Sequence, residues 1–474
     1  MVWISSLAAF GLSLFASFPF ATALPSELPD GLYPGTRAAV STYQIQRELG
    51  VLLSAGSSIF GSNTTGYANL TSRYQEYMPP HPELVVQVGR EKDVSTIIKY
   101  ANRNSIPFFV LNRRHGLPVS QGSFTGIQID MTLLMSITIS KDKKSALFQG
   151  GTYDQQVIDY LWDRGYVTTT GSCACVGMLG PGLGGGHGRL QGRYGLISDN
   201  MRNLNVVLAD GTVTTVSNTS HSDLFWAMQG AGHNFAAVTS FELNIYPRRV
   251  DTWYHKNYVF RQDQLEELFE QLNIVDGNGT QPADLMNHGF FYMDSNFSTT
   301  EPVIWWEFSY AGPQSEAEKY LLPFDKIGPI NVTDGNIPYP QILHATMTGL
   351  DDPLCAHGIN HVVGTAGTQV YNVTTQRQVM DLFIDTVAKV PGLAGTFVVM
   401  EAYGVEGVVS KDPKNSAFPL RDDYLLLQIS VNYLPDPSLD AAALEWVDQC
   451  VELWNQGQPT RRPTTPGAWT GYGA

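Results

Sequence analysis

The chain has 474 residues, of which 43% are hydrophobic and 15% are charged, so it is long enough for two or three lobes and too apolar for a disordered protein. Its 29 basic and 44 acidic residues give a net charge of −15. Contact with phosphates needs clustered Lys and Arg, so this charge excludes nucleic acid as a partner and disfavours an anionic membrane surface.

The first 23 residues have the features of a cleaved secretion signal. They are mostly apolar and end in Ala21-Thr22-Ala23, the small-x-small pattern of a signal-peptidase site. Because the segment contains no Lys or Arg, an uncleaved anchor is the alternative. We expect a signal peptide over residues 1–23, a secreted protein and no membrane span after cleavage.

Asn-x-Ser/Thr triplets agree with passage through the secretory pathway, although such triplets also arise by chance. We expect N-glycans at some of Asn63, Asn69, Asn218, Asn278, Asn296, Asn331 and Asn372.

The stretch from Pro82 to Gly116 predicts a βαβ-like opening. A short apolar strand precedes an amphipathic helix capped by Asp93, and a second apolar strand runs into a loop. The natural result is a parallel pair of strands.

The next segments predict a second group of short elements. We expect strands over 126–131, 137–139 and 145–151, a helix over 154–164, and a hairpin in 206–213 around Asp210-Gly211. Two small α+β lobes therefore occupy residues 24–247.

Aromatic residues become denser after residue 249. We expect antiparallel strands at 253–254, 290–292 and 303–308, and helices over 263–272 and 315–320. A sheet lined with aromatic side chains suits a flat, apolar substrate, and the alternative is that these side chains are simply core.

The most informative feature is a glycine-rich run, GSCACVGMLGPGLGGGHGRLQGRYG, over 171–195, downstream of a loop that contains His115. Gly180, Gly182 and Gly185 satisfy the dinucleotide fingerprint G-x-G-x-x-G. No clear strand precedes them, and no acidic residue follows at the expected distance, which disfavours a nicotinamide site.

Several motifs in order resemble the berberine bridge enzyme-like flavoproteins, which bind FAD in the p-cresol methylhydroxylase (PCMH) or vanillyl-alcohol oxidase fold. The matching stretches are PELVVQVGREKDVSTIIKYA, NRRHG, GIQIDM, GSCACVG, YGLISDN, VVLADGTV and DLFWAMQGAGHNFAAVTSFELNIYP. The resemblance implies an α+β chain with a two-lobed PCMH-type FAD-binding domain over 24–247. It also implies a substrate-binding domain over 248–455, with an aromatic-rich antiparallel sheet flanked by helices.

The resemblance also implies a covalently bound FAD. His115 would bond the 8α-methyl group, and Cys173, in the context Cys-x-x-Val-Gly, would bond C6 of the flavin. Arg113 and Arg114 could supply a positive field there. The further cofactor-binding residues implied are Asn112, Gly116, Gly171, Val176, Gly177, Asp199, Asn200, Gly230, Gly232, Asn234 and Val238. No metal site is expected.

The four cysteines, Cys173, Cys175, Cys355 and Cys450, allow three disulfide pairings. If Cys173 carries the cofactor, Cys355 with Cys450 is the plausible disulfide, and Cys175 stays free and buried.

Candidate catalytic residues come from two stretches of the second domain, FVVMEAYG and DDYLLLQISVNY. Glu401, Tyr403, Gln428 and Asn432 are our candidates for proton abstraction or substrate hydrogen bonding, since the family places acidic, Tyr or Gln side chains there. A strand-end salt bridge is the alternative role for Glu401. Val176 resembles the residue of oxygen-reactive family members, which favours an oxidase over a dehydrogenase.

Two departures from the family pattern stand out. Arg114 occupies the position before the histidine where relatives usually have glycine. Residues 456–474, rich in Pro, Gly and Thr, predict a disordered or truncated tail in place of the usual Tyr- and Asn-bearing closing segment.

The sequence therefore predicts a secreted FAD-dependent oxidase that transfers hydride to flavin N5 and uses O2 as acceptor. Its substrate is a secondary metabolite or a carbohydrate. The alternatives are a flavin-binding cyclase of secondary metabolism and an inactive, truncated relative.

Overall fold

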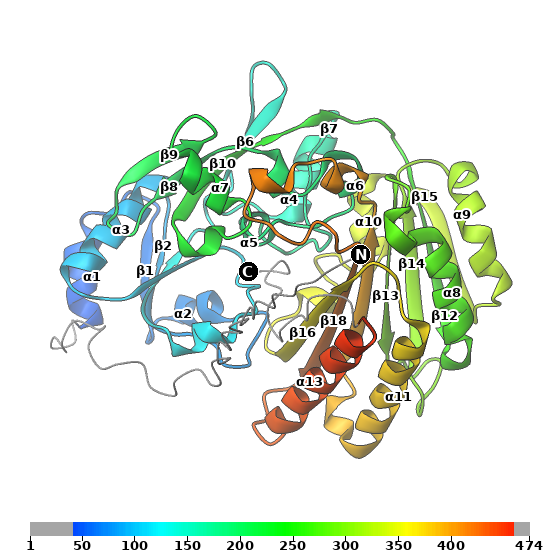
Figure 1. The fold of residues 1–474 in the computed structure, drawn as a ribbon. Helices are drawn as coiled ribbons and strands as arrows, with labels where there is room; N and C mark the ends of the chain where they lie inside the picture. The colour runs from blue at the N-terminus through cyan, green and yellow to red at the C-terminus, as the bar shows by residue number, and fades with distance from the viewer. Residues whose placement is uncertain (1–40, 459–474) are drawn as a thin grey trace, which may run out of the picture. The chain divides into compact units, whose positions relative to one another are not determined.

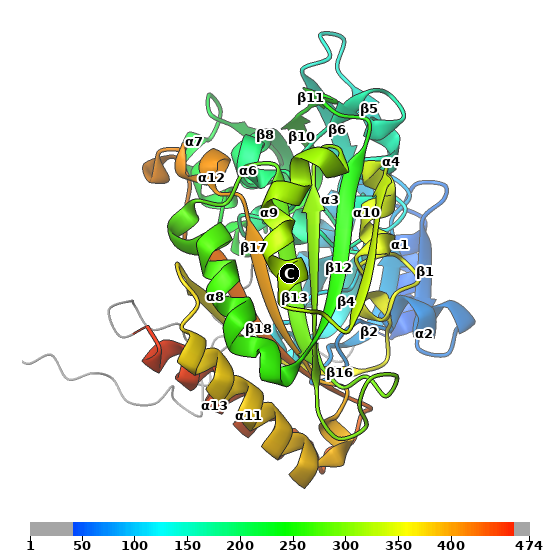
Figure 2. The ribbon, with the colours of Figure 1, turned by 90° about the vertical axis from the view of Figure 1, so that its right-hand side faces the viewer.

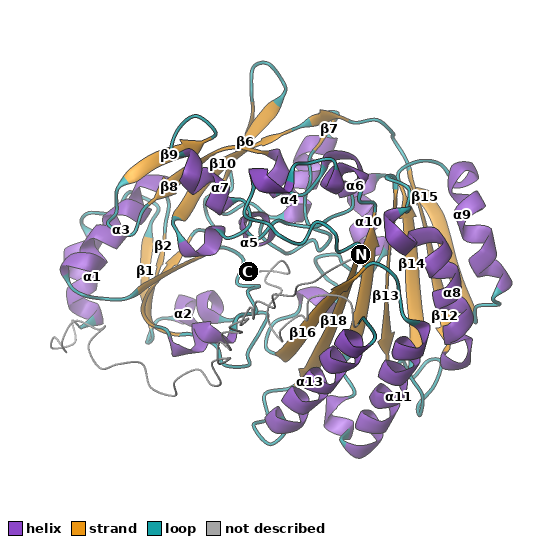
Figure 3. Ribbon diagram, viewed as in Figure 1, coloured by secondary structure: helices purple, strands orange, loops and turns teal. Residues whose placement is uncertain are grey.

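The computed structural model describes residues 41–458. The predicted signal peptide and residues 459–474 of the predicted tail lie outside them. The described chain contains four β-sheets and helices of 4 to 17 residues (Figures 1 and 3). Its helices are α1 (Thr42–Gly50), α2 (Thr65–Thr71), α3 (Glu91–Arg103), α4 (Asp154–Trp162), α5 (Leu179–Leu183), α6 (Gln191–Tyr194), α7 (Ser222–Met228), α8 (Leu265–Asp276), α9 (Gln314–Lys326), α10 (Tyr339–Ala345), α11 (Val373–Lys389), α12 (Glu406–Val409) and α13 (Asp440–Gln456).

The first sheet has the strand order β1-β2-β4-β3. Its strands are β1 (Ser58–Gly61), β2 (His81–Gln87), β3 (Phe108–Leu111) and β4 (Thr125–Asp130). The predicted β-α-β elements are present, but β2 and β3 do not pair with each other, because β4 lies between them and pairs in parallel with both. Apolar side chains of α1 and α3 cover this sheet.

Helix α3 begins at Glu91 with Arg90 as its N-cap residue, so the predicted cap at Asp93 is wrong. Asp93 lies inside the first turn, where its carboxylate accepts hydrogen bonds from Ser54 and from the hydroxyl of Ser57. A carboxylate in the first turn is favourable for the helix without being its cap.

The second sheet is antiparallel, with the order β5-β6-β10-β8-β9. Its strands are β5 (Ile137–Ile139), β6 (Ser145–Gln149), β8 (Met201–Val207), β9 (Val213–Ser217) and β10 (Ala237–Asn244). The predicted strands and the Asp210-Gly211 hairpin are present. A two-stranded sheet joins β7 (Tyr166–Val167) to β11 (Tyr246–Pro247).

The third sheet is antiparallel, with the order β15-β12-β14-β13-β17-β18-β16. Its strands are β12 (Trp253–Arg261), β13 (Leu285–Tyr292), β14 (Val303–Tyr310), β15 (Asn331–Ile337), β16 (Asn360–Thr368), β17 (Phe397–Tyr403) and β18 (Leu425–Tyr433). Helices α8, α9, α11 and α13 lie along one face (Figure 2).

Alternation along the strands of the third sheet divides its side chains between two faces. In β18, Leu425, Leu427 and Ile429 belong to the core under the helices, whereas Gln428 points to the opposite face and lines a cavity. The aromatic residues follow the same rule: Trp306 is core, while Phe290 lines the cavity. Some aromatic residues of this sheet are therefore core, as the alternative had it, and others line a cavity, where their contact with a substrate stays a prediction.

No helix within residues 41–458 is both long enough and apolar enough to span a bilayer.

Candidate active site

Two cavities meet at His115 and Val176, which line both. The larger, of about 590 Å³, lies along β3, the loop that follows it and the segment 233–238. The smaller, of about 140 Å³, extends toward the third sheet. An elongated ligand could therefore run through the larger cavity and place one end in the smaller.

Most of the predicted site residues line these cavities. In the larger are Asn112, Arg113, Arg114, His115, Gly116, Val176, Gly177, Asn234 and Val238. In the smaller are His115, Gly171, Cys173, Val176, Glu401, Tyr403 and Gln428. Asp199, Asn200, Gly230, Gly232 and Asn432 line neither.

Asp199 and Asn200 instead hold the chain together beside the site. Asp199 forms a two-point ion pair with Arg421, with N–O distances of 2.7 and 3.1 Å. The side chain of Asn200 donates to the carbonyl oxygens of Tyr194 and Leu196. Both side chains are therefore engaged by other parts of the protein, and their predicted contact with the cofactor stays a prediction.

The two arginines before His115 are already engaged. Arg114 has φ +59°, a left-handed conformation that explains why glycine suits this position, and its guanidinium pairs with Asp130 at 2.7 Å. Arg113 lies over the ring of Tyr153 and donates from Nε to the carbonyl oxygen of Cys175. The predicted positive field is therefore partly neutralised by Asp130.

A stack of three rings fixes the orientation of His115. Tyr74 lies between His115 and His361, with both pairs of ring centroids 3.9 Å apart and nearly parallel. Burial lowers the pKa of His115 to about 3 and that of His361 to about 4, so both imidazoles are neutral near pH 7. Asn432 accepts from His361 Nδ1 at 2.6 Å and so supports this stack.

The cysteine pairing differs from the prediction. Cys175 forms a disulfide with Cys355, and Cys173 and Cys450 are free. Cys450 lies in α13 and is packed into the core of the third sheet, whereas Cys355 lies in a short turn, Pro353–Cys355, beside the cavity. The Cys355–Cys450 prediction is wrong because it relied on elimination, and sequence separation does not reveal which thiols meet.

A polar row crosses the cavity face of the third sheet. Glu307, His288 and Glu401 occupy directly opposite positions on β14, β13 and β17. His288 Nδ1 lies 2.8 Å from a carboxylate oxygen of Glu307, and Arg189 lies 3.4 Å from the same oxygen. Arg189 also donates to the carbonyl oxygen of Ser172, beside Cys173.

Glu401 forms the acid–base feature of this row. Its carboxylate accepts a 2.5 Å hydrogen bond from the hydroxyl of Tyr403, which also lies 2.9 Å from Ser172 Oγ. Burial raises the pKa of Glu401, and His288 and the bond from Tyr403 only partly offset this effect. Burial also raises the pKa of Tyr403 well above its ordinary value, so this hydroxyl stays protonated.

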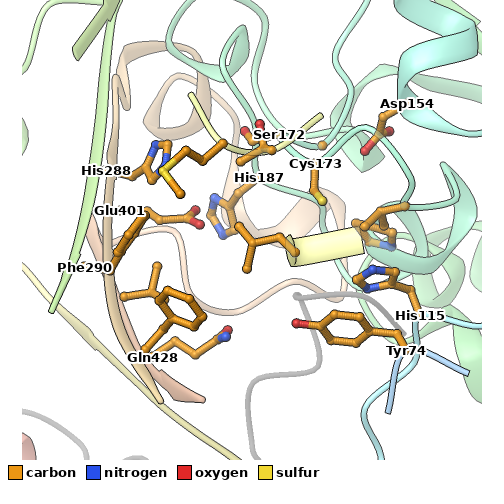
Figure 4. A pocket seen from close by; sticks show the side chains of 18 of the residues that line it. Tyr74, His115, Asp154, Ser172, Cys173, His187, His288, Phe290, Glu401 and Gln428 are labelled. Atoms are coloured by element: carbon orange, nitrogen blue, oxygen red, sulfur yellow. The ribbon is translucent and has the colours of Figure 1, made fainter. Parts of the chain in front are cut away.

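The remaining wall of the smaller cavity is largely apolar. Figure 4 shows Glu401, His288 and Phe290 on one side, with Cys173, His115 and Tyr74 facing them. The apolar lining includes Met286, Phe290, Met347, Phe397 and Val399. The arrangement can hold a flat apolar molecule between a carboxylate and the two residues proposed for covalent attachment.

Several polar residues of the site were not predicted from the sequence. His187, His288 and Tyr74 line the cavity, and Arg189 and Glu307 lie behind it. A charged Glu307 within the apolar stretch VIWWEFSY was a usable signal, because such a residue is rarely buried without a partner. Tyr74 gave no signal, since only the fold brings it against His115.

Comparison with known proteins defines the class of this chain. The model of a family described as FAD binding domain matches residues 82–217, which span most of the first two sheets. The FAD-linked oxidoreductase anuG of Penicillium roqueforti is 58% identical over 465 residues, covering 98% of this chain and 91% of the relative. The chain is thus an FAD-linked oxidoreductase.

Solved structures extend the likeness to the whole fold. BBE-like 1 of Physcomitrella patens matches with TM-score 0.74 and 18% identity, over 87% of this chain and 88% of that chain. Glucooligosaccharide oxidase from Acremonium strictum, described with a 6-S-cysteinyl, 8α-N1-histidyl FAD, matches with TM-score 0.72 and 16% identity, over 90% of each chain. The chain therefore shares the fold of BBE-like and PCMH-type FAD-binding oxidases, and the predicted α+β fold class is confirmed.

Proposed function

We propose that this protein is a secreted oxidase that holds FAD covalently through His115 and Cys173 and oxidises a largely apolar metabolite. The observation that carries this proposal is the Glu401–Tyr403 pair, which faces His115 and Cys173 across an apolar cavity. Residues 24–247 would bind the cofactor, and 248–455 would bind the substrate.

The residues around the two cavities fit an FAD. Buried polar atoms of the His115 loop, Asn112 Oδ1 and Arg114 Nε, have no hydrogen-bond partner among residues 41–458, as expected where a ligand would complete the set. A Cβ at Gly177 would lie 2.5 Å from the side-chain Nδ2 of Asn112, so a larger residue there would displace a side chain that lines the larger cavity. The volume of about 590 Å³ suits the nucleotide end of the cofactor.

Two side chains would hold the flavin end. The neutral imidazole of His115 is held by its stack with Tyr74, and Cys173 is a free thiol at the same cavity. The histidyl and cysteinyl FAD described for the Acremonium strictum oxidase supports an attachment of this kind. When bound, the flavin supplies an acceptor for the hydride of the substrate, which carries both electrons of the oxidation.

Glu401 would take the proton that leaves the substrate, because its raised pKa brings the carboxyl toward the working range of a base. Tyr403 orients this carboxylate by donating to it, and Ser172 positions Tyr403 in turn. Gln428 Oε1 is buried at the cavity with no partner among the described residues, so it is suited to accept a hydrogen bond from the substrate.

The wall of Met286, Phe290, Phe397 and Val399 favours a flat metabolite over a carbohydrate. Each sugar hydroxyl buried against such a wall would lose its hydrogen bonds to water without replacement. Val176, which lines both cavities, supports O2 as the acceptor.

The test uses the purified holoenzyme. We expect yellow colour to remain in the acid-precipitated pellet, and we expect aromatic alcohols, supplied as a panel beside oligosaccharides, to give one peroxide per product. Colour lost to the supernatant would contradict covalent attachment. Oxidation of oligosaccharides alone would contradict the substrate class, and product without peroxide or oxygen uptake would favour a cyclase.

Secretion has separate support. All seven sequon asparagines are exposed, so each could carry a glycan without displacing core. When the full chain is expressed in a yeast host, we expect it in the medium, with a mass that falls on treatment with a peptide N-glycosidase. Retention in the cells without glycans would contradict this part of the proposal.

A further inference from the structure

Three cysteines from two distant segments converge beside the cavity. Cys173 and Cys175 belong to the loop that follows β7, and Cys355 lies 180 residues beyond Cys175 in the turn Pro353–Cys355. The Sγ atom of Cys173 is 3.7 Å from that of Cys175 and 3.7 Å from that of Cys355. Any two of the three could in principle form a bond.

We propose that the Cys175–Cys355 disulfide is a built-in protecting bond, which occupies the second thiol of the loop and keeps Cys173 free to bond the flavin. This inference rests on the proposed attachment of FAD to Cys173. It makes Cys175 and Cys355 positioning residues, since they act through the residues that they control.

The geometry protects Cys173 from exchange with the bond beside it. In such an exchange the Cys173 thiolate would attack Sγ of Cys175, form a Cys173–Cys175 bond and release Cys355 as a thiolate. The attacking sulfur must approach along the axis of the bond that breaks. Because Cys173 is equally distant from both sulfurs, it lies beside the disulfide and not on its axis.

The buried environment of the Cys173 thiol also disfavours exchange with the disulfide. Burial raises the pKa of Cys173 to about 12, so in the protein without flavin the sulfur remains a thiol and is a poor nucleophile toward a disulfide.

The same disulfide also holds the second attachment residue. His115 Nε2 lies 3.4 Å from Cys175 Sγ, and the His115 ring is hydrogen-bonded to the backbone of Leu354, the neighbour of Cys355. The Cys175–Cys355 disulfide ties the turn that carries Leu354 to the loop that carries Cys173. One covalent link therefore fixes the surroundings of both His115 and Cys173.

Removing one cysteine of the pair should redirect Cys173. In Cys355→Ser, the freed Cys175 thiol can form a disulfide with Cys173: the two thiols lose two hydrogens, and oxidised glutathione of the secretory pathway is reduced to two molecules of thiol. In Cys175→Ser, Cys173 can pair with Cys355 in the same way. The double variant Cys175→Ser/Cys355→Ser removes both competitors and leaves Cys173 free.

The experiment measures the flavin-bearing peptides of secreted holoenzyme by mass spectrometry, together with a disulfide map and the absorbance spectrum. We expect the Cys173–flavin peptide to fall at least fivefold in each single variant, with the new Cys173 disulfide on the map, and to return in the double variant. Cys173→Ala is the control that lacks this peptide.

Wild-type levels of the Cys173–flavin peptide in both single variants would overturn the inference. So would equal loss in the single and double variants, or failure of the double variant to fold, because the disulfide would then be only a structural link. If the wild-type flavin carries no bond to Cys173, the proposed attachment itself fails, and the inference fails with it.

Discussion

At the scale of single residues, the chemistry depends on one carboxyl group. We expect Glu401→Gln to lower kcat/KM by about 10²- to 10⁴-fold, the usual contribution of a general base, while leaving bound flavin unchanged. Burial raises the pKa of Glu401 above its ordinary value of 4.5, and the base must be ionised, so wild-type kcat/KM should rise with pH through that raised pKa. The measurement is a pH profile of anaerobic flavin reduction.

Tyr403→Phe is the matched variant for this prediction. It removes the hydrogen bond to Glu401 but not the carboxylate, so we expect a smaller loss and a shift of the profile to higher pH, because that bond lowers the pKa of Glu401. A Glu401→Gln enzyme with an unchanged profile would assign the base elsewhere.

The ring stack gives a second prediction at this scale. Tyr74→Ala removes the ring between His115 and His361, so the imidazole loses its fixed orientation, and we expect several-fold less flavin in the acid-precipitated pellet. Tyr74→Phe keeps the ring and should retain wild-type flavin. Equal retention in both variants would show that the stack does not position His115.

At the scale of secondary structure elements, α8 ends at Asp276, whose buried carboxyl faces Asn287 of β13. Burial raises the pKa of Asp276 to about 7, so the folded state holds a proton that the unfolded chain releases near pH 4. The stability from this proton is complete below about pH 4 and is lost as pH rises to about 7; the loss is at most roughly 4 kcal/mol.

Asp276→Asn should therefore raise the melting temperature relative to wild type, by more at pH 8 than at pH 5. Thermal unfolding at both pH values checks this, with Asp448→Asn, an exposed carboxylate of α13, as the control. An equal change in melting temperature at pH 5 and pH 8 would contradict the raised pKa of Asp276.

The positions of strands were more predictable from the sequence than the segments with which they pair. In residues 424–433, the alternation of Tyr424, Leu426 and Gln428 with Leu425, Leu427 and Ile429 is enough to indicate both the strand and the face of Gln428, because side-chain direction in a strand depends on local sequence. The insertion of β4 between β2 and β3, and the pairing of Cys175 with Cys355, depend on contacts between distant segments. The motifs that carry the resemblance identified His115 and Cys173 as candidates but could not indicate that Asp199 is held by Arg421.

At the scale of the described chain, buried ion pairs join residues 189–199, which precede β8, to the third sheet and its loops. Arg189 lies beside Glu307, and Asp199 pairs with Arg421, whose guanidinium also donates to Ser416 and to the carbonyl oxygen of Val408. Both partners of the Asp199–Arg421 pair are almost fully buried. A buried ion pair adds little stability compared with apolar residues in its place, but a buried charge without its partner destabilises the fold strongly.

Removing one partner of the Asp199–Arg421 pair should therefore destabilise the chain more than removing both. Asp199→Asn leaves the buried charge of Arg421 without its counterion, so we expect the free energy of unfolding to fall by about 3–5 kcal/mol. Arg421→Met should lower the free energy of unfolding by a similar amount, because it leaves the buried carboxylate of Asp199 without a counterion. The double variant should cost clearly less than the sum of the two, since neither charge remains to be compensated. Urea unfolding followed by tryptophan fluorescence measures all three, and strictly additive losses would mean that the two side chains stabilise the chain independently.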